Sequence, residues 1–235
     1  MKLVLVAGPP SVGKTTIIKR IIEKMSHENI CYFKIDVAKA NEDEILRKEY
    51  NIKTNKAYSG DLCPDHTSVV IMKDVIEWAE QNDASLLIVE SAGLCLRCSP
   101  YLTQGVGVGI VSCTSGIHAP EKMGPMLSLA DVIITTRTDL VSQAEKEIMS
   151  QKLYELYKNT LILETNALQG YSLQKLNEVI KQSEEIDINK VELKGNPPVG
   201  TCTICIGKKN VGWKNHYGIV RQMSKNFTGF IYRGD

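Results

Sequence analysis

The sequence lacks an excess of charge of either sign and has no long apolar run. Its 235 residues include 28 Lys and Arg against 27 Asp and Glu, and the pI is near 7.5. A chain this balanced has no overall field to attract nucleic acid or anionic lipid. No apolar run reaches the ~18 residues that cross a bilayer, and the apolar stretch after Lys2 is too short for a signal peptide. We therefore expect a cytoplasmic protein with no nucleic acid and no membrane as partner.

The absence of a secretion signal also decides how the seven cysteines are interpreted. Because the cytosol keeps thiols reduced, they are not expected to form a disulfide framework. Closely spaced pairs in such a chain indicate metal or redox chemistry instead. The sequence also has no internal repeat and no low-complexity tract.

Short apolar, β-branched segments alternate with amphipathic, charged ones along most of the chain. Strands are predicted at 2–7, 30–36, 85–90, 107–113, 131–136 and 160–165, and helices at 15–27, 42–50, 67–82, 142–158 and 172–184. Strands that are apolar on both faces and separated by helices form parallel sheets covered on both sides. The pattern predicts an α/β fold with a doubly wound, mostly parallel, Rossmann-like sheet.

The composition changes after residue 184. A polar stretch with a Pro-Pro break at 197–198 leads into a segment with Gly, aromatic residues and short alternating runs. Such a segment suits a hairpin or small meander. We expect an NTPase domain at 1–190 and a small β-rich C-terminal appendage at 191–235.

The strongest motif is GPPSVGKT, which lies between a predicted strand and a predicted helix. It matches the P-loop pattern G-x-x-x-x-G-K-[ST], in which backbone N–H groups surround the phosphates. Lys14 is expected to reach the β- and γ-phosphates, and the Thr15 hydroxyl is expected to ligate Mg²⁺. The predicted phosphate-binding residues are Gly8, Pro9, Pro10, Ser11, Val12, Gly13, Lys14, Thr15 and Thr16.

Acidic residues end two of the predicted strands. Asp36 closes the second strand, where it would act as a Mg²⁺ ligand through water or as a base that orients the attacking water. Glu90 closes the third strand in the stretch ESAG, which resembles the acidic-x-x-Gly turn that senses the γ-phosphate. The resemblance implies that the Gly93 amide can donate to that phosphate and that Glu90 can approach Mg²⁺ or its waters. The predicted catalytic residues are Lys14, Asp36 and Glu90.

These motifs together resemble one family. The set GPPSVGKT, Asp36, ESAG, the stretch TRTD and the later LETNALQG is similar to the SIMIBI-class GTPases of the UreG, HypB and CobW types. The resemblance covers about residues 1–183. It implies a P-loop domain in which GTP binding and hydrolysis control dimerisation and the handover of nickel to a client enzyme.

The resemblance also implies how the base is recognised. Asp139 in TRTD would accept hydrogen bonds from guanine, which adenine cannot supply. Thr136 and Arg137 stand where the family has Asn and Lys, which weakens the preference and leaves ATP open. Asn166 and Ala167 correspond to the last base contact of the family.

Two cysteine-containing stretches correspond to metal-binding positions of the family. Cys63 and His66, in CPDH, stand where urease-type members have the nickel or zinc ligands Cys-Pro-His, with one residue inserted here. Ligation by this pair and a structural role for it are equally acceptable interpretations. Cys95 and Cys98, in CLRC, stand near the ligating cysteine of the hydrogenase-type members.

A second Cys-x-x-Cys pair, Cys202 and Cys205, lies in the predicted appendage. Two such pairs can supply four thiolates to Zn²⁺ or Ni²⁺, or hold an iron–sulfur cluster, within one chain or across a dimer. The less favoured interpretations are a redox dithiol and inert buried thiols.

Two functions remain open at this stage. One is a nucleotide-driven metallochaperone that acts as a homodimer on a client metalloenzyme or its accessory proteins. The other is an ATP-driven electron-transfer protein with a [4Fe-4S] cluster clamped between two subunits. The P-loop lacks the additional N-terminal lysine of that second class, which favours the first. A metabolic kinase ranks last, because no acceptor-binding signature is evident.

Overall fold

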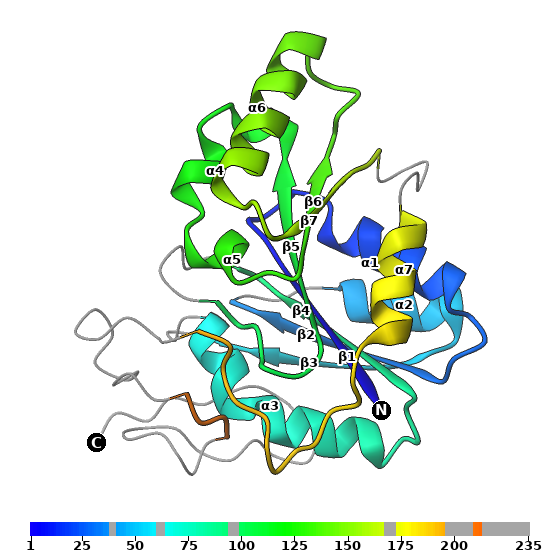
Figure 1. Ribbon diagram of the computed structural model, residues 1–235. Coiled ribbons are helices and arrows are strands. Elements are labelled where there is room, and N and C mark those ends of the chain that lie inside the picture. Colours follow the sequence, from blue (N-terminus) through cyan, green and yellow to red (C-terminus); the bar gives the residue numbers. More distant parts are fainter. Residues whose placement is uncertain (38–40, 60–63, 94–98, 167–172, 196–208, 213–235) are drawn as a thin grey trace.

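The computed structural model describes residues 1–37, 41–59, 64–93, 99–166, 173–195 and 209–212 (Figure 1). These residues form a seven-stranded sheet in the order β3-β2-β4-β1-β5-β6-β7, in which every pairing is parallel. The strands are β1 Lys2–Ala7, β2 Ile30–Asp36, β3 Lys53–Tyr58, β4 Leu86–Ser91, β5 Val106–Ser112, β6 Val132–Thr136 and β7 Leu161–Glu164. The predicted doubly wound α/β fold is confirmed.

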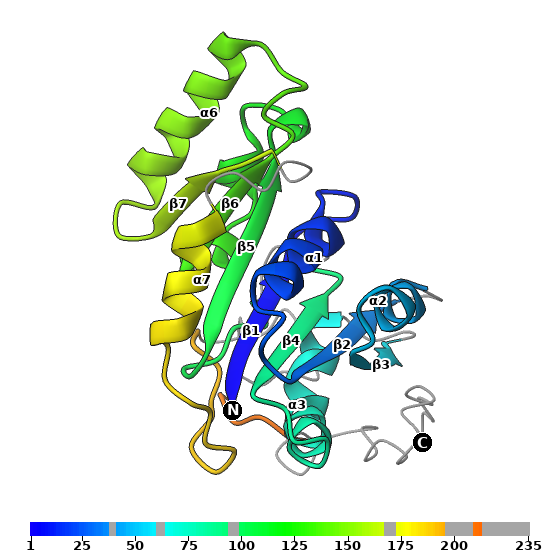
Figure 2. The same cartoon turned by 90° about the vertical axis from the view of Figure 1, so that its right-hand side faces the viewer.

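Helices cover both faces of this sheet. Figure 2 shows α1 Lys14–Lys24, α2 Glu42–Tyr50 and α7 Leu173–Gln182 on one face. The other face carries α3 Pro64–Glu80, the short α4 Ala119–Lys122 and α5 Pro125–Ser128, the 3-10 turn Cys113–Ser115 and α6 Gln143–Leu156. None of the described helices is long and apolar enough to cross a membrane.

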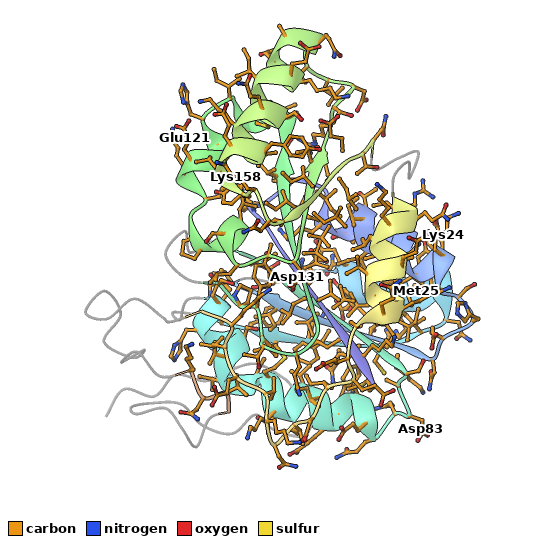
Figure 3. The ribbon with its side chains drawn as sticks, viewed as in Figure 1. Lys24, Met25, Asp83, Glu121, Asp131 and Lys158 are labelled. Atoms are coloured by element: carbon orange, nitrogen blue, oxygen red, sulfur yellow. The ribbon has the colours of Figure 1, made fainter. Side chains whose placement is uncertain are left out.

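The alternation of side chains along each strand explains the two layers. In β1, Val4 and Val6 are buried against the α1 side, whereas Leu3 and Leu5 are buried against the α3 side. Successive side chains of a strand point to opposite faces, so a strand that is apolar throughout contributes to two cores at once. Figure 3 shows side chains filling the space between the sheet and the helices on both sides.

One strand was not predicted. Lys53–Tyr58 reads KTNKAY, and only Ala57 in it is buried. It forms β3 at the edge of the described sheet, next to β2. A polar sequence is tolerated there because an edge strand faces solvent.

The chain after α7 returns across the α3 side of the molecule. Leu193 and Val211 are buried in the core on that face, and the Gly212 amide donates to the Val69 carbonyl at 2.9 Å. Lys194 forms an ion pair with Asp131, which is labelled near the centre of Figure 3. The described part of the C-terminal segment therefore packs on the NTPase core, and the boundary at residue 190 stays a prediction.

Candidate functional site

The P-loop connects the end of β1 to the start of α1. Gly13 directly precedes α1 with φ +96°, a conformation that favours glycine. The Lys14 ammonium donates to the carbonyls of Gly8 and Pro9, at 2.9 Å each. Burial lowers the pKa of Lys14, although the nearby charge of Glu90 opposes this shift. The lysine thus lies folded over the loop, at the N-terminus of a helix that favours anions.

A cavity of about 500 Å³ opens beside this loop. It lies at the carboxyl ends of β1, β2 and β4, where doubly wound sheets bind their ligands. Its lining combines P-loop residues with charged groups from β2, α2, β4 and the turn after β6: Pro10, Ser11, Gly13, Lys14, Thr15, Thr16, Lys34, Asp36, Val37, Glu42, Glu90, Ala92 and Arg137. Its position and lining fit a nucleoside triphosphate.

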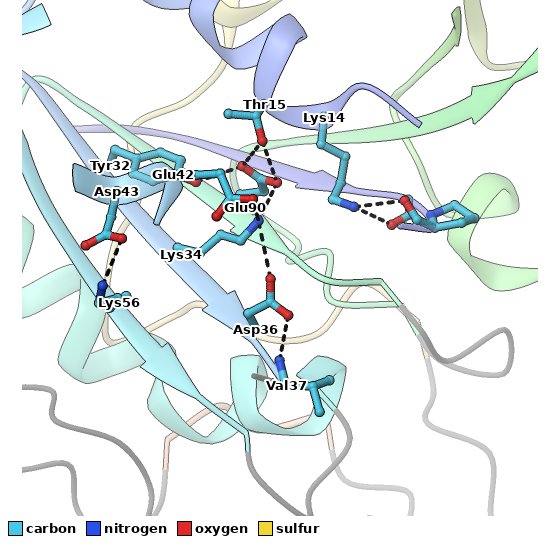
Figure 4. A network of polar contacts seen from close by, with 12 residues as sticks. Lys14, Thr15, Tyr32, Lys34, Asp36, Val37, Glu42, Asp43, Lys56 and Glu90 are labelled. Atoms are coloured by element: carbon cyan, nitrogen blue, oxygen red, sulfur yellow. Dashed lines mark hydrogen bonds and ion pairs between the residues drawn. The ribbon is translucent and has the colours of Figure 1, made fainter. Parts of the chain in front are cut away.

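Glu90 is the centre of a polar network in this cavity (Figure 4). Its carboxylate accepts hydrogen bonds from the Thr15 hydroxyl at 3.2 Å and from the Tyr32 hydroxyl at 2.7 Å. The Lys34 ammonium donates to it at 2.7 Å. Burial and the charge of Glu90 raise the pKa of Tyr32 well above its usual value, so this phenol stays a neutral donor.

Asp36 and Glu42 complete the acidic side of the cavity. The Lys34 ammonium lies 3.5 Å from Asp36 and 3.8 Å from Glu42. Burial lowers the pKa of Lys34, but the charge and hydrogen bond of Glu90, followed by Glu42 and Asp36, raise it more. Lys34 is therefore a charged group in the wall of the cavity.

The oxygen groups of this wall fit Mg²⁺. The Thr15 hydroxyl donates a hydrogen bond to Glu90, so the lone pairs of the Thr15 oxygen remain available to a cation. Carboxylates and hydroxyls are the hard ligands that this ion prefers. Thr15, Asp36 and Glu90 line the same cavity, and their assignment to Mg²⁺ stays a prediction.

Sequence reasoning missed Tyr32, Lys34 and Glu42. A period of two in β2 places Tyr32, Lys34 and Asp36 on one side of the strand. The signal was a lysine within an otherwise apolar strand, ICYFKID. Pairing of Lys34 with Glu90 across β2 and β4 then brings the two charges together.

The ESAG turn packs directly on the P-loop. Gly93 has φ +56°, and a Cβ added to it would lie 2.6 Å from the Gly8 nitrogen. On the other side of the turn, the Ser91 hydroxyl donates to Asp65, in the first turn of α3, at 3.3 Å. The turn thus lies between the phosphate-binding loop and the segment that follows Cys63.

The predicted base-reading residues lie at the end of β6 and just after β6 and β7. Thr136 donates to the Val12 carbonyl at 2.6 Å, and Arg137 donates to the Ser11 carbonyl. Both therefore contact the backbone of the P-loop, and Arg137 also lines the cavity. Asp139 is exposed in the turn after β6, and Asn166 follows the adjacent β7. Ala167 lies outside the described residues.

Most of the predicted metal ligands also fall outside the described ranges. These are Cys63, Cys95, Cys98, Cys202 and Cys205. His66 is described and is buried in the first turn of α3. Within the described part of the chain, no group of three or more His, Cys, Asp or Glu side chains is arranged to hold a metal ion.

The two described cysteines are of another kind. Cys31 and Cys113 are buried, and burial raises the pKa of each to about 11. Thiols with such a pKa are protonated near neutral pH and are poor metal ligands. Both therefore act as small apolar residues of the core.

Comparison with known proteins gives consistent matches. The family model described as the CobW/HypB/UreG nucleotide-binding domain matches residues 2–164. An uncharacterized protein of Methanocaldococcus jannaschii is 34% identical over 239 residues, which cover 100% of both chains.

Two solved structures share the fold. The hydrogenase maturation factor HypB of Archaeoglobus fulgidus has a TM-score of 0.63 at 23% identity, over 77% of this chain and 89% of its own. HypB of Helicobacter pylori, solved in complex with nickel, has a TM-score of 0.61 at 16% identity, over 77% and 86%. With the P-loop, the acidic cavity wall and the family match, the chain belongs to the CobW/HypB/UreG family and is a P-loop nucleoside triphosphate hydrolase.

Proposed function

We propose that this NTPase is a GTP-dependent metallochaperone that couples hydrolysis to the handover of a metal ion to a client enzyme. The observation that carries the proposal is the ESAG turn. Glu90 accepts a hydrogen bond from Thr15 of the P-loop. Gly93, which is two residues before Cys95 in the sequence, packs on Gly8. A turn that responds to the γ-phosphate would therefore act on the adjoining thiols.

In the nucleotide half of the function, Lys14 and the backbone N–H groups of the P-loop would hold the phosphates. Mg²⁺, held through Thr15 with Glu90 and Asp36 beside it, would neutralise the charge that develops on the transferred phosphoryl group. Asp36 accepts a hydrogen bond from the Val37 amide at 2.7 Å, which orients its carboxylate at the end of β2. That carboxylate would orient the attacking water.

Guanine is the expected base, and replacement of Asp139 tests this. The exposed Asp139 carboxylate does not share the P-loop contacts that Thr136 and Arg137 make, so its loss should leave the phosphate site intact. We expect Asp139→Ala to raise the Kd for GTP by about tenfold or more, because a charged hydrogen bond to the base is lost. The Kd for ATP, measured in the same titration, should stay within about twofold. Equal effects on both nucleotides would remove the guanine assignment.

In the metal half, we infer that the two Cys-x-x-Cys pairs of one chain share one cargo ion, Zn²⁺ or Ni²⁺. The Tyr101 carbonyl, three residues after Cys98, accepts from the Lys194 amide at 2.9 Å. The Leu193 amide donates to the carbonyl of Lys209, four residues after Cys205, at 2.8 Å. Because a residue spans at most ~3.6 Å, these short connections permit both pairs to reach one ion.

The pair Cys63 and His66 is a second candidate for ligation of the cargo. Asp65, which lies between them and is the residue inserted relative to the urease-type pattern, is bonded to Ser91 of the ESAG turn. A movement of this turn would therefore also displace the segment that carries Cys63. A homodimer would bring two such segments together, as the family resemblance implies.

Removal of the first thiol pair tests the metal half of the proposal. We expect Cys95→Ser/Cys98→Ser to lower the bound zinc or nickel per chain by at least about half, because two of four thiolates are lost. Nucleotide affinity should change little, because the described lining of the cavity already supplies the P-loop and the carboxylates that would hold the nucleotide and Mg²⁺. The measurement is elemental analysis of protein purified without oxygen.

The matched control for this test is Cys113→Ala, which removes a buried thiol with a high pKa. Its metal content should equal that of the parent protein. Unchanged metal content in the double variant would refute the ligand assignment. A brown protein with broad absorption near 400 nm would favour a [4Fe-4S] cluster, and with it an electron-transfer or cluster-carrying function.

A further inference from the structure

Lys34 is a buried lysine that the phosphate-binding motifs do not include. Its side chain is only 4% exposed, and its ammonium lies 2.7 Å from Glu90, 3.5 Å from Asp36 and 3.8 Å from Glu42. It lies on β2, next to the edge strand β3, opposite Glu90 in the pairing of β2 with β4 (Figure 4). Three carboxylates of the nucleotide cavity therefore converge on one ammonium.

The two lysines that line the cavity in the described part of the chain have different partners. Lys14 donates to two backbone carbonyls of the P-loop, a neutral arrangement that it can leave for phosphate oxygens. Lys34 instead forms a buried ion pair, and the charges of its partners hold it in place. Burying an ammonium is costly unless it neutralises a buried charge, so its role is tied to Glu90.

We propose that the Lys34 ammonium is the built-in counter-ion of the Mg²⁺ site and competes with divalent cations for the carboxylates of Glu90, Asp36 and Glu42. Before nucleotide arrives, it neutralises part of their charge and weakens the attraction for a free cation. The phosphates of a bound nucleotide add negative charge, and the site then favours Mg²⁺. The inference rests on the Mg²⁺–nucleotide site of the proposed function, but not on the metal cargo.

The charges decide the direction of the effect. Three carboxylates and one ammonium have a formal charge of −2, and replacing the lysine with an uncharged residue makes it −3. Unit charges a few ångströms apart near a protein surface interact strongly enough to change a binding constant by far more than tenfold. The Thr15 hydroxyl, which donates to the same Glu90 carboxylate, would supply an additional neutral ligand.

The experiment is a titration of nucleotide-free protein with Mn²⁺, followed by the EPR signal of the free ion. We expect Lys34→Met to bind one Mn²⁺ with a Kd at least about tenfold lower than that of the parent protein. The matched control is Lys56→Met on the neighbouring β3. Lys56 pairs with Asp43 at 3.1 Å and does not line the cavity among the described residues. Its Kd for Mn²⁺ should equal that of the parent.

Two further variants keep the test decisive. Lys34→Gln retains a donor for Glu90 but no charge, and replaces Lys34→Met if that variant does not fold. Lys34→Met/Glu90→Gln removes both charges of the pair and should lose the gained Mn²⁺ affinity. If Lys34→Met and Lys34→Gln fold but bind Mn²⁺ no more tightly than the parent, the counter-ion role is overturned. Because neither nucleotide nor cargo metal is present, this result is distinguishable from failure of the proposed function.

Discussion

Lys14→Ala should abolish nucleotide hydrolysis, with kcat falling by at least about 10³-fold, because the P-loop ammonium that can follow the charge of the transferred phosphoryl group is lost. In the described residues, the other lysine of the cavity is held by Glu90 at 2.7 Å and cannot replace it at the phosphates. The measurement is phosphate release under saturating nucleotide.

The fold should survive this change. Lys14 donates to the carbonyls of Gly8 and Pro9, at the cavity, and its burial already disfavours its charge. The melting temperature should therefore fall little. Lys19→Ala, five residues later on α1, removes a surface ion pair with Glu49 and serves as the control with unchanged kcat. Turnover of Lys14→Ala within about twofold of the parent would contradict the assignment of Lys14 to the phosphates.

Local patterns were sufficient to predict the apolar strands, the P-loop and the acidic strand ends. The apolar strands needed only the alternation of apolar and amphipathic segments, and the P-loop needed a motif with its flanking elements. The sequence assigned Thr15 and Glu90 separately to Mg²⁺, and the hydrogen bond between them is seen only in the structure. β3 was not predicted because its sequence is polar and its position depends on pairing with β2.

The missed residues depend on contacts between distant segments. Burial of Lys34 requires the register that sets it opposite Glu90, 56 residues away in the sequence. Thr136 and Arg137 contact carbonyls of the P-loop more than 120 residues earlier, at Val12 and Ser11. No local pattern encodes such pairings, so these two positions could be predicted only as a departure from the family motif.

Gly93→Ala should uncouple the ESAG turn from the P-loop and reduce kcat by about 10²-fold or more, because a shift of about 1 Å in catalytic geometry has that effect. The added Cβ would lie 2.6 Å from the nitrogen and 2.7 Å from the oxygen of Gly8, and backbone atoms cannot rotate away as a side chain can. Either the phosphate-binding loop or the turn must move, and Glu90 lies on the strand that leads into this turn.

The variant Gly116→Ala is the control that shows the effect of backbone strain without a clash. Gly116 also has a positive φ, +87°, but a Cβ added there would meet no neighbouring atom within 4 Å among the described residues. Both variants should therefore lose stability from an L-residue at positive φ, by about 1–2 kcal/mol, seen as a lower melting temperature. Only Gly93→Ala should also lose hydrolysis and nucleotide affinity. If the two variants hydrolyse nucleotide equally well, the contact between Gly93 and Gly8 does not transmit the state of the nucleotide. A route to the proposed metal ligands must then be sought through Ser91 and Asp65, which lies next to His66 in the segment that follows Cys63.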